Sequence, residues 1–566
     1  MTGPKIPIAI ETDIEKYRQA GETFGQKCSR IATTLSDTKE HYDKFVDILK
    51  EQRFLPGGRI QSAIGATRKV TAFNCFVMQQ VPDTFDGIMD VAKEAGATMR
   101  MGGGVGYDFS GIRPKGAPIK SLDSKASGPV SFMGIFDSVC GTIASAGHRR
   151  GAQMACLRVD HPDILEYVTA KNNTNKLVNF NTSVLVTDTF MEAVINNEGF
   201  DLVFDGKVYE TVNASALWDT IMRSTWDWAE PGVIFIDRVN KMNNLWYLED
   251  ISATNPCGEQ PLPPYGACLL GSFNLTKYVW FPGDHDTKKT QFQWERLKND
   301  IPYVVRAMDN VIDRTIYPLP QQEEEAKSKR RMGLGITGLA NTLTAMGMRY
   351  GSTEALMFLD ELLGVLANTA YRSSVELAIE KGPFPAYVED YNKSEYLKVL
   401  KTGTRDLIKK HGIRNSHLIS IAPTGTISLT ANNVSSGLEP VYRHEYSRDI
   451  ITGEGAKKQY IQDYAYMEWG LKCDTVKEVT VEEHIDTLCT AQKWVDSAIS
   501  KTCNVGSDVT WEQFKYIYLK AYLGGAKGCT THREDGKRTG ILHAEPEVEQ
   551  GGACYIDLET GMRSCE

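Results

Sequence analysis

The alternation of two kinds of segment between about residues 175 and 440 is the feature that most limits the fold of this chain. Short apolar, β-prone runs at 183–186, 232–236 and 418–421 are separated by longer stretches with helical periodicity. Strands that alternate with helices in this way are typical of α/β proteins. The pattern therefore predicts an α/β fold, and the length of 566 residues requires either a large barrel or several domains.

Helical periodicity also marks the beginning of the chain. Apolar residues recur every three or four positions from 11 to 54, and the run at 54–59 ends this segment with turn residues. Two further helices are predicted at 84–101 and 131–146, separated by a glycine-rich turn at 102–106 and a polar loop at 113–128. From about residue 441 the chain is more polar, and it ends in a segment rich in Gly and Glu.

Composition and charge exclude several classes of protein. Hydrophobic residues make up 42% of the chain and charged residues 24%, as in ordinary globular proteins. The net charge of −9, without aromatic residues interleaved with basic runs, argues against nucleic-acid binding. Neither a secretory signal nor a membrane span is predicted. The twelve cysteines show no CxxC pair and no zinc-binding spacing, so we expect a cytoplasmic protein without a metal site.

An amide, a thiol and a carboxylate occupy alternate positions at Asn255, Cys257 and Glu259. In an extended backbone these side chains share one face, which brings together a hydrogen-bond donor, a sulfur nucleophile or radical, and an acid or base. A Pro-Gly turn with an incidental cysteine is the alternative interpretation of so short a motif. Two further cysteines, Cys268 downstream and Cys75 far upstream, favour the chemical interpretation.

A second candidate site is the small, hydroxyl-rich turn that follows the 418–421 run. A helical segment comes after it, so its backbone N–H groups and hydroxyls are placed to bind an anion, although a simple helix cap fits the same pattern. The residues of this turn are Thr424, Gly425, Thr426, Ile427 and Ser428. The glycine-rich turn at 102–106 lacks the spacing of a phosphate or dinucleotide loop and alone is weak evidence.

Taken together and in this order, the motifs resemble those of the catalytic subunit of ribonucleotide reductases, and most of all the adenosylcobalamin-dependent class II enzymes. The resemblance covers about residues 50–533. It also rests on the segments at 73–76, 101–110, 149–154, 160–164 and 435–440. The 525–533 segment lacks the tyrosine pair of class I subunits, and the Arg-x-x-Gly-Tyr segment of glycyl-radical enzymes is absent.

Two alternatives to a class II enzyme stay open. One is a class I large subunit that needs a separate radical-generating small subunit. The other is a nucleotide-binding regulator that descends from a reductase. The chain contains no Asp-x-His-x-x-Gly motif, so no histidine stands out as a cobalt ligand and no cofactor-binding residue is predicted.

The resemblance implies a particular fold, a ten-stranded α/β barrel made of two five-stranded parallel halves. A finger loop in its centre carries the cysteine that becomes a thiyl radical. The implied organisation is a mostly helical segment at 1–70 without a full ATP cone, the barrel at 71–533 with effector and dimer helices near 84–146, and a tail at 534–566.

The resemblance also implies a reaction, the reduction of ribonucleotides to 2′-deoxyribonucleotides for DNA synthesis, with adenosylcobalamin as cofactor and diphosphates as the expected substrates. Cys257 abstracts the 3′ hydrogen of the ribose, Glu259 is the general base, and Asn255 holds the ribose hydroxyls. Cys75 and Cys268 supply two electrons and form a disulfide.

Substrate-binding and redox roles follow for further residues. Asn74, Gly104 and the turn at 424–428 are expected to contact the substrate, the turn through its phosphates. Cys554 and Cys565 are candidates for a redox shuttle to the active-site disulfide by thiol exchange. Their external reductant would be a thioredoxin-like or glutaredoxin-like protein.

By the same resemblance the helices at 84–101 and 131–146 form a homodimer interface. A deoxynucleoside triphosphate effector binds there and changes which base is reduced fastest. The residues expected to bind it are Asp83, Arg113, Arg149 and Arg150. Ordinary solvent-exposed connections are the alternative for the two loops that carry these arginines.

Overall fold

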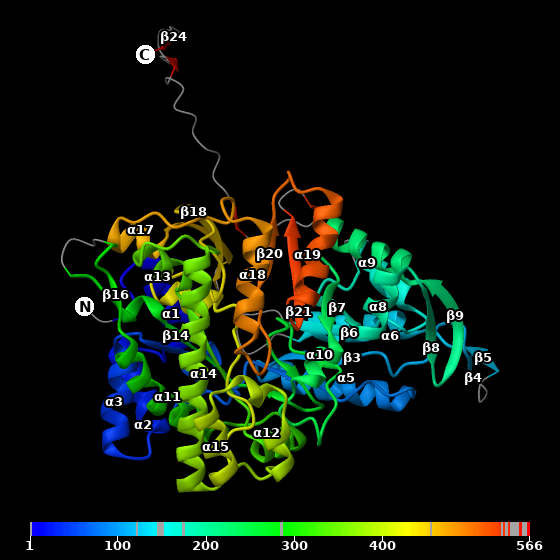
Figure 1. Ribbon diagram of the computed structural model, residues 1–566, viewed down its shortest axis with the longest axis horizontal. Coiled ribbons are helices and arrows are strands. Elements are labelled where there is room, and N and C mark those ends of the chain that lie inside the picture. Colours follow the sequence, from blue (N-terminus) through cyan, green and yellow to red (C-terminus); the bar gives the residue numbers. More distant parts are fainter. Residues whose placement is uncertain are drawn as a thin grey trace.

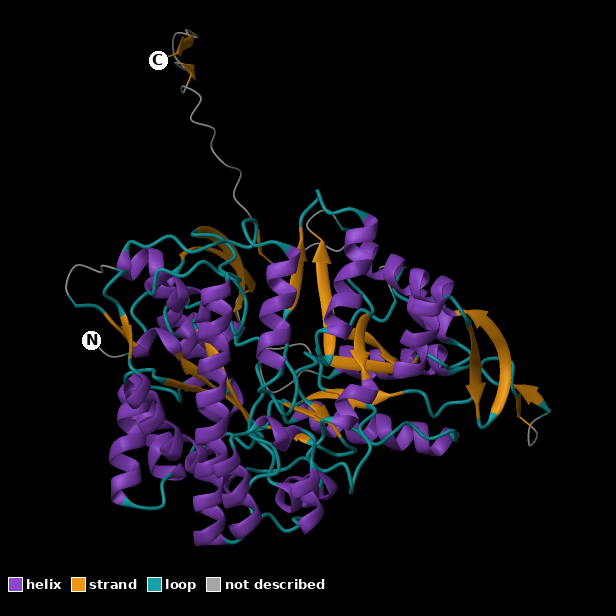
Figure 2. Cartoon of the chain, viewed as in Figure 1, coloured by secondary structure: helices purple, strands orange, loops and turns teal. Residues whose placement is uncertain are grey.

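The computed structural model describes residues 3–119, 123–143, 152–172, 176–282, 287–452, 455–533, 536–537, 542–543, 554–556 and 563–565. Helices pack around strands throughout the main body, so the predicted α/β class is confirmed (Figure 1 and Figure 2). Within the described residues, no helix combines the length and the hydropathy that crossing a membrane requires.

Three helices form the beginning of the chain, as the periodicity at 11–54 predicts: α1 (Pro7–Tyr17), α2 (Phe24–Leu35) and α3 (Lys39–Lys50). Thr23 and Gln26 form a capping box at the start of α2, which satisfies backbone N–H groups that the helix leaves unpaired.

The run at 54–59 differs from the predicted turn. It forms strand β1 (Phe54–Pro56) and the start of helix α4 (Gly58–Ala63). The reason is tertiary, because β1 pairs with β14 (Leu270–Asn274) and the buried Phe54 ring packs against Phe273, with 5.1 Å between ring centres. Pairing with a distant strand thus overrides the local turn residues.

Five parallel strands lie side by side in the order β2 (Cys75–Val77), β3 (Gly104–Asp108), β6 (Gln153–Arg158), β7 (Phe180–Val186) and β10 (Gly232–Phe235). Most of their residues are buried, as in parallel sheets covered on both faces. β7 and β10 confirm the strands predicted at 183–186 and 232–236. The helices between these strands are α5 (Phe85–Arg100), α6 (Pro129–Thr142), α7 (Ile164–Thr169), α8 (Asp188–Asn196) and α9 (Ala214–Trp228).

A second group of parallel strands follows later in the chain. β14 pairs with β17 (Gly333–Thr337), and β20 (Thr502–Val505) pairs with β21 (Gly528–Arg533). Between these pairs, the run at 418–421 makes single parallel bridges, Leu334 with Ile419 and Ile421 with Ile499, instead of the continuous strand predicted. Antiparallel pairs join the two groups, namely β13 (Ala267–Cys268) with β2, and β21 with β10.

Two large hydrophobic clusters support the strand groups. One combines α2, α3, α11 (Trp294–Arg314) and α14 (Thr353–Lys381) with β14 and β17. The other combines α5, α6, α9 and α19 (Trp511–Leu523) with β3, β6 and β7. Figure 1 shows α3, α11 and α14 on the left of the molecule and α6, α8 and α9 on the right. A third, smaller cluster contains Ala253, Leu262, Cys268 and Ala422.

The remaining elements are shorter or peripheral. The helices are α10 (Ile236–Lys241), α12 (Pro320–Lys329), α13 (Leu339–Ala345), α15 (Thr402–His411), α17 (Tyr464–Trp469) and α18 (Val481–Gln492). The hairpins are β4–β5 (Pro118–Ile119, Ser124–Lys125), β8–β9 (Gly199–Phe204, Lys207–Asn213), β15–β16 (Val279–Trp280, Gln291–Phe292), β18–β19 (Glu445–Thr452, Gly455–Gln462) and β23–β24 (Cys554–Ile556, Arg563–Cys565).

Candidate active site

A short hairpin carries the motif at 255–259. Its strands are β11 (Ala253–Thr254) and β12 (Pro261–Leu262), and the turn between them, residues 255–260, is called the finger below. Asn255 N donates to Gln260 O (3.2 Å), and Gly258 N donates to Asn255 O (3.0 Å). The prediction of an extended backbone with alternating faces is therefore wrong. Pro256 and Gly258 fold the motif into a turn, and Gly258 has the positive φ of +80° that favours glycine.

The hairpin is fixed to both groups of strands. In the first group, β11 lies against β3 at Gly106. A β-carbon on Gly106 would lie 1.9 Å from the Thr254 carbonyl oxygen, so glycine alone permits this close approach. From the second group, Ser420 Oγ and Ala498 N both donate to the Glu259 carbonyl oxygen at 2.9 Å. The backbone of the finger is thus held at both of its ends.

The two reactive side chains of the finger differ in exposure. Cys257 is exposed, whereas Glu259 is only 2% exposed. Burial raises the pKa of Glu259 to about 7, and the nearby Asn255 amide offsets only part of this effect. A carboxyl group with such a pKa exchanges protons near neutral pH, which suits a general base.

Cys75 and Cys268 face each other directly in the antiparallel pair of β2 and β13, where opposed side chains are close neighbours. Burial raises the pKa of Cys268 well above its usual range, and the Cys75 thiol, Glu259 and Cys257 add to the increase. Because these neighbours act only over short distances, the three cysteines and Glu259 form one cluster.

Unpaired polar atoms gather at this cluster. In the described part of the chain, eleven buried side-chain nitrogen or oxygen atoms lack a hydrogen-bond partner, and four of them belong to Asn74, Asn255, Glu259 and Gln260. Buried polar atoms are normally paired. Such a concentration of unpaired donors and acceptors indicates a place where a polar ligand supplies the partners.

Asn74 and Gly104, both expected to contact substrate, lie beside the cluster. Asn74 N donates to Cys268 O (3.1 Å), and Gly104 N donates to Asn74 O (2.9 Å). A β-carbon on Gly104 would lie 3.1 Å from both Cys75 Sγ and Pro256 Cγ. Any side chain at this position would fill the space between Cys75 and the finger.

The hydroxyl-rich turn leads into the short helix α16 (Gly425–Thr430). Thr424 has a left-handed backbone at φ +54°, and its hydroxyl pairs with Thr337 Oγ1 (3.0 Å) and accepts from Gly437 N (2.8 Å). The Thr424 side chain is therefore engaged in bracing the turn. Ala422, just before the turn, belongs to the same small cluster as Cys268, so the turn is a neighbour of the cysteines.

The rest of this turn has one open flank. A β-carbon on Gly425 would meet nothing within 4 Å. Thr426 is half-buried, Ile427 is buried, and Ser428 Oγ pairs with Ser436 Oγ at 2.9 Å. Open space therefore borders the turn at its first helical residue.

Asp83 and Arg113 form an ion pair with each other. Arg113 Nε lies 2.7 Å from Asp83 Oδ2, and Arg113 N donates to Asp83 Oδ1 (3.0 Å). This pair ties the start of the 113–128 loop to the segment that leads into α5, two residues before the helix begins. Arg149 and Arg150 lie outside the described residues, as do the side chains of Cys554 and Cys565, whose backbones face each other in the β23–β24 hairpin.

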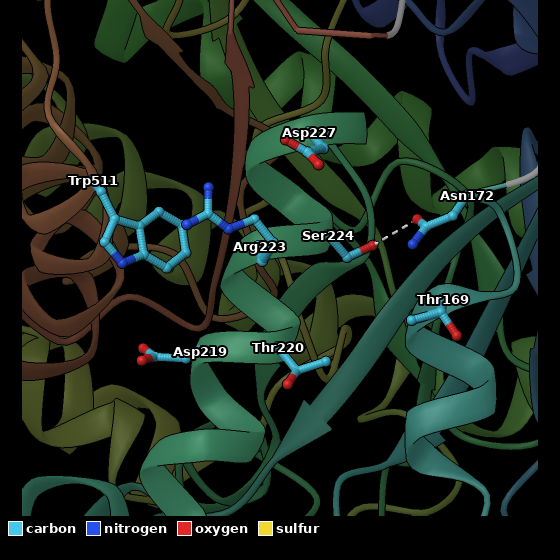
Figure 3. Close-up of a pocket in the computed structure, with 8 residues that line it drawn as sticks. All are labelled: Thr169, Asn172, Asp219, Thr220, Arg223, Ser224, Asp227 and Trp511. Carbon is cyan, nitrogen blue, oxygen red and sulfur yellow. Dashed lines mark hydrogen bonds between the residues drawn. The ribbon is translucent and has the colours of Figure 1, made fainter.

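A cavity of about 330 Å³ opens elsewhere, between α7, α9 and α19 (Figure 3). The Arg223 guanidinium lies 4.1 Å from the centre of the Trp511 ring there, with Asp219 and Asp227 also lining the cavity. None of the residues predicted from the sequence lines it, so it is separate from the finger. Within the described chain, no group of three or more His, Cys, Asp or Glu is arranged to bind a metal ion.

Three residues in or beside the finger were not predicted from the sequence. Gln260 is the last residue of the finger, Ser420 donates to the Glu259 carbonyl oxygen, and Asn181 on β7 donates from Nδ2 to the Pro256 carbonyl oxygen at 2.9 Å. Gln260 directly follows the motif, which is a usable signal. Ser420 and Asn181 are ordinary polar residues beside apolar runs, and only the fold brings them to the finger.

Comparison with known proteins identifies the family of the chain. Residues 73–532 match the barrel domain of ribonucleotide reductase. The chain belongs to the ribonucleotide reductase family. The vitamin B12-dependent ribonucleoside-diphosphate reductase of Thermoplasma acidophilum is 33% identical over 95% of this chain and 71% of its own length. The enzyme of the same name from Mycobacterium tuberculosis is 32% identical over 98% of this chain and 82% of its own length.

A reductase with a different name is also similar. The ribonucleoside-diphosphate reductase subunit alpha of Chlamydia pneumoniae is 24% identical over 80% of this chain and 51% of its own length. The recognition of a ribonucleotide reductase from the sequence motifs is confirmed by the family match.

Proposed function

We propose that this reductase is a class II enzyme that converts ribonucleotides to 2′-deoxyribonucleotides with adenosylcobalamin as cofactor. The observation that carries the proposal is the cluster formed by exposed Cys257, buried Glu259 and the facing thiols of Cys75 and Cys268. The relatives from Thermoplasma acidophilum and Mycobacterium tuberculosis, named as vitamin B12-dependent, support the choice of cofactor.

Each residue of the cluster has one role in the reaction. Cys257, as a thiyl radical, removes the 3′ hydrogen of the ribose and later returns it. Glu259, as the carboxylate, takes the proton of the 3′ hydroxyl and so helps the 2′ hydroxyl leave as water, while the Asn255 amide holds the ribose hydroxyls. Cys75 and Cys268 give up two electrons and two protons, and their sulfur atoms join in a disulfide.

Adenosylcobalamin, when bound, supplies the initial radical, which the acid–base groups of a protein do not generate. The exposure of Cys257 fits this requirement, because a large group can reach its thiol. No residue is assigned to the cofactor itself.

We also propose that the two strand groups close into a ten-stranded barrel spanning 71–533, between a helical segment at 1–70 and a tail at 534–566. The support is a continuous series of neighbours. It runs from β2 through β3, β6, β7 and β10 to β21 and β20. The 418–421 run continues it through a bridge to Ile499, just before β20, and a bridge to β17, which pairs with β14. β13 precedes β14 directly in the chain and pairs with β2, where the series began. A hairpin held by both groups suits the centre of such a barrel.

The expected substrate is a ribonucleoside diphosphate. Its ribose lies against Asn74 and Gly104, and its phosphates lie at the 424–428 turn. The open flank at Gly425 and the place of Ala422 in the same hydrophobic cluster as Cys268 support this placement.

Partners complete the proposal. α5 and α6 form a homodimer interface, which the exposure of Phe85 and Met89 on α5 supports. A deoxynucleoside triphosphate effector binds at Asp83, Arg113, Arg149 and Arg150. Cys554 and Cys565 carry electrons from a thioredoxin-like or glutaredoxin-like reductant, and their facing positions in a hairpin suit a dithiol pair. A cytoplasmic location stays a prediction from the cysteine pattern.

The test is anaerobic incubation of the purified chain with a ribonucleoside diphosphate, a dithiol and adenosylcobalamin. We expect deoxyribonucleotide only when the cobalamin is present. Product formed without cobalamin after addition of an iron- or manganese-containing partner would identify a class I large subunit instead. No product under either condition, with effector binding retained, would identify a regulator.

A further inference from the structure

We infer that Asn181 is a positioning residue for Cys257. Asn181 Nδ2 donates to the Pro256 carbonyl oxygen at 2.9 Å. That oxygen belongs to the planar peptide group whose nitrogen is the backbone nitrogen of Cys257. The bond therefore orients the plane from which the Cys257 side chain projects. The inference rests on the proposed role of Cys257 as the group that removes the 3′ hydrogen.

The place of this bond in the hairpin explains its importance. The bonds from Ser420 and Ala498 hold Glu259 on the returning side of the hairpin, and the close approach at Gly106 holds Thr254 on its entering side. Pro256 and Cys257 lie between these anchors, at the tip. Asn181 brings a fixed donor from β7 to this tip.

The exposure of Asn181 supports a positional role. The other residues of β7 are buried, whereas Asn181 is exposed. Its amide reaches the carbonyl of Pro256, the residue directly before exposed Cys257. A single hydrogen bond typically contributes only a small part of the net stability of a protein. The chain should therefore fold without it, so that an effect on the direction of the sulfur atom can be measured separately.

Asn181→Ala and Asn181→Asp test the inference in the complete enzyme. Both remove the amide donor, and the second keeps the shape of the side chain. We expect kcat to fall about 10- to 100-fold, because a displacement of about 1 Å at a reacting atom has a cost of this order. KM should change by less than about threefold, since substrate binding is retained. The deuterium isotope effect from the substrate 3′ position should increase, because hydrogen abstraction becomes slower relative to the other steps.

Asn310→Ala is the matched control. Asn310 on α11 also donates from Nδ2 to a backbone carbonyl, that of Leu35 at the end of α2, at 2.8 Å, and to Asp37 Oδ1 at 2.9 Å, and within the described residues it makes no bond to the finger. Its loss should lower stability while kcat and the isotope effect stay the same. If Asn181→Ala and Asn181→Asp lose activity while the isotope effect stays the same, Asn181 is merely structural and the inference is overturned.

A second measurement needs neither cofactor nor turnover. The reduced chain is treated with iodoacetamide, and alkylation of Cys257 and Cys75 is followed peptide by peptide with mass spectrometry. Asn181→Ala should raise the Cys257 rate relative to that of Cys75 by at least about threefold, because the tip of the finger is released. An unchanged ratio would overturn the inference, even if the wild-type chain proved inactive as a reductase.

Discussion

Replacement of Glu259 by glutamine isolates the cost of burying an acid at the active site. The side chain is 2% exposed, and its pKa rises from 4.5 to about 7, chiefly because burial disfavours the charged form. The folded protein therefore keeps this proton up to about pH 7, whereas the unfolded chain releases it near pH 4.5. Glutamine has nearly the same shape and no charge at any pH.

The sign and size of the effect follow from this difference in pKa. Below pH 4.5 the group is protonated in both states, and its contribution to stability is fully present. Between pH 4.5 and about 7 the unfolded chain loses the proton first, so stability falls as pH rises, and above about 7 the loss is constant. A difference between 4.5 and about 7, at about 1.4 kcal/mol per pKa unit, corresponds to about 3 kcal/mol.

Urea denaturation of the wild type and of Glu259→Gln measures this quantity. Between about pH 5 and about pH 8, the free energy of unfolding of the variant should rise by about 2 kcal/mol relative to that of the wild type, although the variant is inactive. Glu512→Gln is the control, because its side chain is 78% exposed and its charge is solvated in both states. If the free energies of unfolding of the wild type and of Glu259→Gln differ by the same amount at about pH 5 and at about pH 8, the buried-acid argument is refuted.

Three further predictions concern the reaction and the finger. If Glu259 is the base, kcat/KM of the wild type should rise with pH and level off above about 7, and a profile that falls through this range would contradict the assignment. Gly106→Ala should abolish activity, since the added β-carbon would lie 1.9 Å from the Thr254 carbonyl oxygen. Gly25→Ala should keep activity, because its β-carbon would meet nothing within 4 Å, and similar activities in the two variants would count against the role of Gly106. Cys257→Ser should abolish both turnover and hydrogen exchange at the ribose, while Cys75→Ser should block only dithiol-dependent product formation, and identical behaviour would overturn this division of roles.

Local sequence patterns predict the central elements of the fold better than its edges. β10 and the second half of β7, residues 183–186, are found because they are largely apolar and buried on both faces. β1 is missed because Pro56 and Gly57 read as a turn, and the pairing with β14 that makes it a strand involves residues more than 200 positions away. β20 and β21 are missed because they have partly exposed positions between buried ones, which lowers their apolar signal.

The proximity of the candidate catalytic residues is predicted more reliably than the local structure that joins them. Cys257, Glu259, Cys75 and Cys268 do form one cluster, although the motif is a turn and not an extended strand. Asn181 and Ser420 were not predicted because both donate to backbone carbonyl oxygens. Such bonds depend on where the chain runs in space, so they leave no pattern in the sequence.

The finger separates two tasks between its backbone and its side chains. Its backbone is held by neighbouring strands, through bonds from Ser420, Ala498 and Asn181. Its polar side chains, those of Asn255, Glu259 and Gln260, each keep a buried atom without a partner. An unpaired buried atom costs about 1–3 kcal/mol, so a sequence selected for stability alone would satisfy these groups internally. A substrate would then have to break those bonds before it could bind. Leaving the side chains unpaired on a rigid backbone lowers stability, but it keeps the hydrogen-bonding groups ready for a polar ligand, which under the proposed function is the ribose.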